Sequence, residues 1–121
     1  MSPKRGDRVA PPPGPGEWDV IFGTSEAAQG WEELCRQAAT NARLAWQAMR
    51  LDPAPDAETP RHHRMRRELA TRVFQGEELP QWQIEVTSGG RIWYVVDERQ
   101  RRVVVTYAST RHPKVTDKRG H

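Results

Sequence analysis

The sequence predicts one α+β domain, in which a short first strand and an antiparallel pair of helices precede an antiparallel β-meander that completes one twisted sheet. Three observations support this prediction. Apolar residues alternate at period two along the last third of the chain, which is typical of strands. Before the middle of the chain they recur at helical spacing. The length of 121 residues suits one domain.

Differences in composition divide the chain into three parts. Residues 1–16 are rich in proline and glycine and show no hydrophobic periodicity. Such a segment cannot bury enough surface to offset the entropy cost of ordering, so we expect a disordered tail. We expect residues 17–115 to form the folded domain and residues 116–121 to form a flexible C-terminal tail.

A short strand and two helices are predicted to open the domain. Residues 17–22 (EWDVIF) alternate as a strand does. Thr24 or Ser25 then supplies the cap of a first helix. A second helix begins near Thr40, and the prolines that follow Asp52 end it. Apolar stripes mark the buried faces, with Ala27, Ala28, Trp31, Leu34 and Cys35 on the first helix and Ala42, Ala45, Trp46 and Met49 on the second.

The meander is predicted from residue 70 onward. Residues 70–74 (ATRVF) and 79–87 form two strands joined by a turn. Ser88-Gly89-Gly90 closes the next hairpin, because glycine tolerates a positive φ. The last two strands cover residues 91–97 and 102–109. If both helices pack on one face of this sheet, the other face is expected to be partly open.

Charge is distributed unevenly along the chain. Residues 59–121 contain thirteen Lys or Arg against seven acidic residues, a net charge of +6, whereas residues 17–58 carry −5. The densest cationic run is RHHRMRR at residues 61–67, whose secondary structure the sequence leaves open. A polyanion such as RNA is the natural partner of this basic half, and an unevenly charged soluble surface is the alternative.

Several classes of protein and of site are not supported. The chain has no apolar run long enough to span a bilayer, and no apolar stretch follows the basic N-terminus as in a signal peptide. Cys35 is the only cysteine, and we interpret it as a small core residue rather than a nucleophile. No spacing of paired ligands suggests a zinc site. We therefore expect a cytoplasmic protein without a metal, a cofactor or a membrane partner.

The order of elements and several motifs resemble the RelE/ParE superfamily of bacterial toxins. The likeness covers residues 17–115 and rests on RMRREL, QWQIEV, a glycine turn, RIWYVVD, VVVTYAS and TRHPK. The resemblance implies the RelE-like fold, a cognate antitoxin, and a metal-independent endoribonuclease that cuts mRNA in the ribosome. Two alternatives stay open. ParE-like members poison DNA gyrase without nuclease activity, and a chain of this fold can also be a non-toxic RNA-binding module.

The resemblance also assigns catalytic residues. Arg91 matches the arginine that opens the strand after the glycine turn, and Arg111 or His112 matches the basic residue or histidine after the last strand. Some members carry cations on the strand before the turn, where this chain has Gln83 and Glu85. This is a departure from the family pattern. Glu85 is either a base, as in some relatives, or an ion-pair partner of Arg91.

These residue types suit metal-free cleavage of RNA, which needs a base, an acid and cations for the developing charge. We expect Arg91 to reach outward and hold phosphate oxygens, and His112 to transfer a proton. Arg111 and Lys114 would fix the flanking phosphates. Solvated surface charge is the plainer interpretation of each. Further phosphate contacts, which position RNA without reading bases, are predicted for Arg64, Arg66 and Arg67.

Three more aromatic side chains are candidates for RNA contact rather than for catalysis. His62 and His63 lie in the basic run, and we interpret them as RNA contacts rather than catalytic groups. Trp93 offers a face on which a base can stack, but a tryptophan within a strand is more often part of the core.

Overall fold

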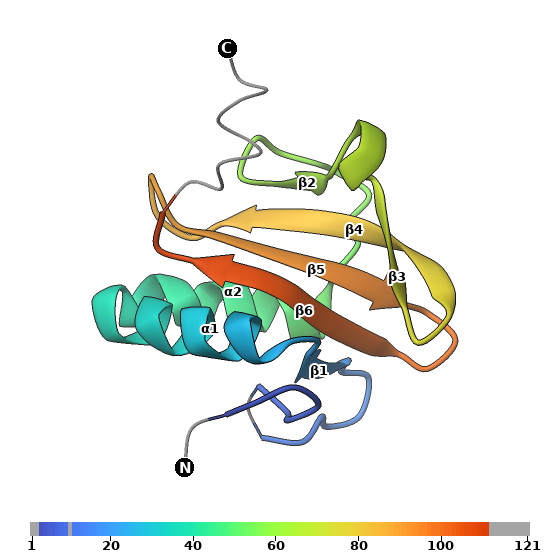
Figure 1. Cartoon of the computed structure of the whole chain (residues 1–121), viewed down its shortest axis with the longest axis horizontal. Coiled ribbons are helices and arrows are strands. Elements are labelled where there is room, and N and C mark those ends of the chain that lie inside the picture. Colours follow the sequence, from blue (N-terminus) through green and yellow to red (C-terminus); the bar gives the residue numbers. More distant parts are fainter. Residues whose placement is uncertain (1–2, 10, 112–121) are drawn as a thin grey trace.

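The computed structural model describes residues 3–9 and 11–111, which form two helices packed against a mixed six-stranded sheet (Figure 1). The α+β class is therefore confirmed. The helices are α1 (Ser25–Gln37) and α2 (Ala39–Leu51), and a short 3-10 helix spans Arg67–Leu69. The strands are β1 (Asp19–Phe22), β2 (His62–Arg64), β3 (Thr71–Phe74), β4 (Glu77–Glu85), β5 (Arg91–Asp97) and β6 (Arg102–Ser109).

The strands follow one another across the sheet in the order β1-β6-β5-β4-β2, and β3 pairs with β4 off this path. β4, β5 and β6 form the predicted antiparallel meander. β1 instead pairs with β6 in parallel and aligns Val20 with Val103. Parallel neighbours need a long connection, and here both helices and the other four strands lie between them in the sequence.

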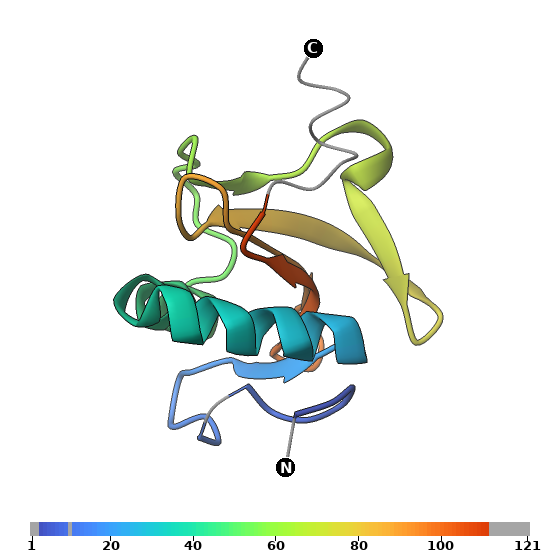
Figure 2. The same cartoon turned by 60° about the vertical axis from the view of Figure 1, so that its left-hand side comes forward.

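The two helices bury their apolar stripes against one side of the sheet, here called the helix face (Figure 2). The Thr24 hydroxyl accepts a hydrogen bond of 2.9 Å from the backbone N–H of Ala27 and so caps α1, as predicted. None of the helices in the described part of the chain is long and apolar enough to cross a membrane. The helix face contributes Trp82, Ile84, Val86, Ile92, Tyr94, Val96, Val103 and Val105 to the core.

The opposite side of the sheet, here called the distal face, is more covered than we expected. The β3–β4 hairpin folds over one end of it, where Leu79 packs with Val95 and Val104 in a second apolar cluster. Figure 2 shows this hairpin on the side of the sheet away from the helices. At the other end the side chains bury one another, as Gln83 and Trp93 do with exposed fractions of 8% and 7%. Glu85, Tyr107 and Ser109 on the same face are half-buried, so the face is closed at the hairpin end and partly open at the other end.

The N-terminal segment is ordered along β1 over residues 3–9, where we expected a disordered tail. The backbone N–H of Val9 donates to the carbonyl of Val20 at 2.8 Å. The guanidinium of Arg8 binds the Asp19 carboxylate through hydrogen bonds of 2.6 and 3.1 Å. Backbone hydrogen bonds satisfy this segment without an apolar side-chain pattern, which is why its composition did not reveal the pairing.

Candidate functional site

Buried polar side chains gather on the distal face. Burial of such groups costs free energy unless each finds a hydrogen-bond partner. Here partners are present: the Thr106 hydroxyl donates to Oε1 of Gln81 at 2.9 Å, and Asp97 forms an ion pair of 3.3 Å with Arg102. In the described part of the chain, the buried polar or charged residues are Gln81, Gln83, Arg91, Asp97 and Thr106, all on β4, β5 and β6.

The strand register arranges this region in two neighbouring rows that cross the sheet. The first row contains His63, Gln83, Trp93 and Tyr107, one from each of β2, β4, β5 and β6. The second row contains Glu85, Arg91 and Ser109. Residues two apart on a strand are roughly 7 Å apart. The two rows therefore form one patch, which we call the distal patch, beside the β4–β5 turn.

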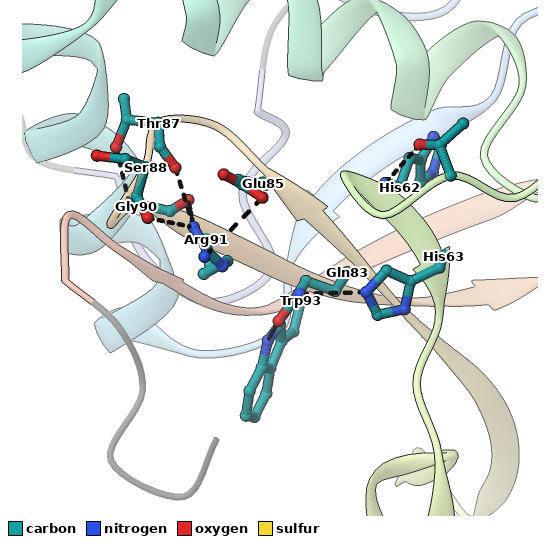
Figure 3. A network of polar contacts seen from close by, with 10 residues as sticks. His62, His63, Gln83, Glu85, Thr87, Ser88, Gly90, Arg91 and Trp93 are labelled. Atoms are coloured by element: carbon teal, nitrogen blue, oxygen red, sulfur yellow. Dashed lines mark hydrogen bonds and ion pairs between the residues drawn. The ribbon is translucent and has the colours of Figure 1, made fainter. Parts of the chain in front are cut away.

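A chain of hydrogen bonds runs along the first row (Figure 3). The indole Nε1 of Trp93 donates to Oε1 of Gln83 at 2.8 Å, so the amide nitrogen faces His63, with its Nε2 3.4 Å from the ring Nε2. The other ring nitrogen, Nδ1, lies 2.8 Å from the carbonyl of Arg64. Trp93 also packs on Tyr107 with ring centroids 4.8 Å apart. Trp93 is therefore a buried member of the network rather than an exposed stacking surface.

Arg91 does not reach outward, so that expectation is wrong. Its side chain is 8% exposed and folds back onto the β4–β5 turn (Figure 3). Nη1 donates to the carbonyls of Thr87, Ser88 and Gly90 at 2.9, 3.2 and 3.0 Å. The Gly90 carbonyl also accepts from the backbone N–H of Val86 at 2.9 Å, so the guanidinium adds a further donor to a turn that backbone hydrogen bonds already close. The geometry supports a structural role for Arg91 in holding the turn.

Glu85 joins Arg91 in the second row. Its Oε2 lies 3.9 Å from Nη2 of Arg91, and its side chain is 23% exposed. The ion pair, one of the two roles left open for Glu85, is therefore confirmed, whereas its role as a base stays a prediction. Glu85 also lines a cavity of about 240 Å³ next to α2, together with Arg61 and Asn41.

The three arginines predicted to bind phosphate differ in their accessibility. Arg64 is half-buried, and its Nη2 donates to the carbonyl of Ala70 at 3.1 Å. Arg66 has a side chain that is 69% exposed and pairs with Glu58 at 3.3 Å. Arg67 is exposed and has a positive φ of 58°. Arg66 and Arg67 are thus the members of the trio that an RNA phosphate can reach most easily.

The last predicted site residues follow β6. Arg111 is exposed, and its backbone N–H donates to the Ser109 hydroxyl at 3.0 Å. Ser109 is aligned with Arg91, so Arg111 leaves the sheet at the end where the second row lies. His112 and Lys114 lie outside the described residues.

His62 and His63 belong to β2, a strand that the sequence did not predict, and their side chains point to opposite faces. His62 lies at the helix face, where its Nε2 is 2.5 Å from the Tyr94 hydroxyl. That hydroxyl donates to the carbonyl of Pro53 at 2.7 Å, so His62 is the donor to Tyr94. Burial lowers the pKa of His62, and the nearby carboxylate of Asp52 opposes this effect.

The half-buried His62 predicts that the protein loses stability in mild acid. The pKa of His62 lies below its ordinary value of 6.5 in the folded state, so the unfolded chain binds this proton more readily. The contribution of neutral His62 to the free energy of unfolding is therefore complete above that ordinary pKa and is lost as the pH falls below it. For one proton, this loss is at most about 1.4 kcal/mol per pH unit. Urea unfolding at several pH values should show a smaller acid loss for His62→Gln than for the wild type. Equal losses would contradict the assignment.

Cys35 fits the predicted structural role. It is half-buried against the core, and burial, followed by the nearby Glu32 carboxylate, raises the pKa of its thiol. A thiol with a raised pKa is a poor nucleophile at neutral pH. Within residues 3–9 and 11–111, no group of three or more His, Cys, Asp or Glu side chains is placed to hold a metal ion.

Comparisons with known proteins do not identify the chain. No protein-family model matches it, and neither a curated protein nor a solved structure shows significant similarity to it. Its function is therefore inferred from the side chains of the distal patch and from the resemblance of the sequence motifs.

Proposed function

We propose that this protein is the toxin of a toxin–antitoxin pair, with a RelE-like fold, and that it is a metal-independent endoribonuclease that cuts mRNA on the ribosome. The observation that carries the proposal is the distal patch. The neighbouring cluster of Leu79, Val95 and Val104 covers the same face with apolar groups. Beside it, the patch places an imidazole, an amide, a carboxylate and a guanidinium. Such a network is costly to bury, which favours a functional role.

The proposed reaction uses proton transfer and cations without a metal ion. A base removes the proton of a ribose 2′-hydroxyl, cations neutralise the charge that develops on the phosphate, and an acid protonates the departing 5′-oxygen. The resemblance supports Glu85 and His112 as candidates for proton transfer. The exposed guanidinium groups of Arg66, Arg67 and Arg111 are suited to bind the phosphates. The cognate antitoxin would neutralise this activity in the cell.

The proposal predicts that expression of the chain alone stops growth by halting translation. Purified protein should cut mRNA on programmed ribosomes and leave a 2′,3′-cyclic phosphate end, with EDTA present or absent. A single 2′-deoxy nucleotide at the cut site should block cleavage there, because it removes the attacking hydroxyl. Pulse-labelling is the cellular measurement. If DNA synthesis stops first while translation continues, the ribonuclease proposal is wrong.

A second candidate is a gyrase-directed toxin without nuclease activity. One observation favours it: the guanidinium of Arg91, expected to stabilise the transition state, is bonded to three carbonyls of its own turn. In this case Glu85→Gln would leave toxicity intact, and purified gyrase, rather than the ribosome, would be inhibited. A non-toxic RNA-binding module would instead bind RNA, leave it uncut and allow growth.

A further inference from the structure

His63 lies between the buried network and an accessible cavity. It belongs to the edge strand β2, and its half-buried ring faces Gln83 on one side. It also lines a shallow cavity of about 420 Å³ together with Glu58, Thr59, Pro60 and Arg66. The Arg66 side chain at this cavity is 69% exposed. Arg66 pairs there with the carboxylate of Glu58 at 3.3 Å, so a phosphate that approaches His63 competes with Glu58 for this guanidinium.

The hydrogen-bond chain fixes where the His63 ring carries its proton. An indole N–H only donates and a backbone carbonyl only accepts, so the direction is set at both ends of the chain. It runs from Trp93 through Gln83 to His63 and on to the carbonyl of Arg64. Neutral His63 is therefore protonated on Nδ1 and carries a lone pair on Nε2. The contact of 3.4 Å from the amide nitrogen occupies that lone pair only weakly.

The amide of Gln83 explains the departure from the family pattern noted in the sequence. A cationic side chain at this position would only donate hydrogen bonds. Glutamine supplies an acceptor for Trp93 and a donor for His63 at once. The imidazole of His62 does not offer the same chemistry, since it lies at the helix face and is bonded to Tyr94.

Resting on the proposed function, we infer that His63 is the catalytic base and that Gln83 and Trp93 are its positioning residues. Nε2 of His63 takes the proton from a ribose 2′-hydroxyl of the bound RNA. The 2′-oxygen forms a bond to phosphorus, and the bond from phosphorus to the 5′-oxygen of the next nucleotide breaks. That oxygen leaves with a proton from water. The products are a 2′,3′-cyclic phosphate and a 5′-hydroxyl, and His63 returns its proton to solvent.

The first test is single-turnover cleavage of ribosome-bound mRNA by the full chain and by His63→Asn. Loss of one general base is expected to slow cleavage about a hundredfold or more while RNA binding stays unchanged. Thermal unfolding checks that the variant is folded. If the wild type cuts and His63→Asn cuts equally fast, the inference is wrong while the proposed function stands. If the wild type does not cut at all, both are wrong.

The pH dependence of cleavage distinguishes positioning from a merely structural effect. In Gln83→Glu, a carboxylate still accepts from Trp93 but also stabilises the protonated ring of His63. The acidic limb of the rate profile should therefore shift to higher pH by about one unit. Gln100→Glu adds the same charge at an exposed position and should leave the profile unchanged. An unshifted profile for Gln83→Glu would remove Gln83 from the role.

The proton position itself can be measured without any activity. Nitrogen-15 NMR of the imidazole groups distinguishes the two neutral tautomers of histidine. We expect neutral His63 to carry its proton on Nδ1, as the carbonyl of Arg64 requires. A neutral His63 protonated on Nε2 would overturn the inference even if the protein cuts RNA.

Discussion

Gly30→Ala is expected to destabilise the protein by about 3 kcal/mol or more, although alanine normally favours a helix. Gly30 lies in α1, where this helix crosses β6. A β-carbon added at this position would stand 1.8 Å from the carbonyl oxygen of Ala108 and 2.6 Å from its carbonyl carbon. Both are backbone atoms of β6, which cannot turn aside as a flexible side chain can. The helix must therefore move away from the sheet.

Urea unfolding measures this effect, and Gln29→Ala is the matched control. Gln29 precedes Gly30 on the same helix but is exposed, so its replacement should change the free energy of unfolding only slightly. Ala108 lies between Tyr107 and Ser109, the β6 members of the two rows. We therefore expect Gly30→Ala to lose cleavage activity as well. A variant as stable as the wild type would mean that α1 does not pack this closely on β6.

Local patterns were sufficient to predict most of the core elements. The run from Arg91 to Asp97 follows a glycine turn and is rich in β-branched and aromatic residues, and the structure has β5 with these same bounds. Thr24 is the cap of α1 because its hydroxyl is placed to accept from the first turn. In each case the information lies within a few neighbouring residues.

The parts that the sequence did not predict depend on contacts between distant residues. β2 has only three residues, all of them polar, and it exists because its backbone pairs with β4. His63 becomes a candidate base only once this pairing places it beside Gln83. Nothing within RHHRMRR tells which of His62 and His63 faces the distal patch. Their side chains point to opposite faces only because this segment forms a strand. A three-residue strand is too short for alternation to reveal it.

Arg91 illustrates a different limit of sequence reasoning. The sequence predicted that Arg91 would reach outward to a phosphate, with a solvated charge as the alternative, and the composition of the turn gave no other indication. Its burial follows from the three carbonyls that the turn directs toward it. The position of Arg91 in the fold was thus predicted, whereas the direction of its side chain was not.

Arg91→Ala is accordingly expected to lower the free energy of unfolding by about 3 kcal/mol, because it leaves three turn carbonyls without this donor and removes the ion-pair partner of Glu85. Arg99→Ala is the matched control. Its side chain is 83% exposed and forms an ion pair of 3.7 Å with Glu77, so its loss should cost at most about 1 kcal/mol.

Cleavage measured at a low temperature, where Arg91→Ala is still folded, distinguishes the two roles of this arginine. If Arg91 holds the turn, stability and activity should both fall, and Arg91→Lys should recover only part of each, because an ammonium group cannot reproduce the planar fork of a guanidinium. If Arg91 instead turns toward a bound phosphate, Arg91→Ala should be as stable as Arg99→Ala and yet inactive. That result would restore the transition-state role first expected for Arg91 and would contradict the structural role inferred from its three carbonyl contacts.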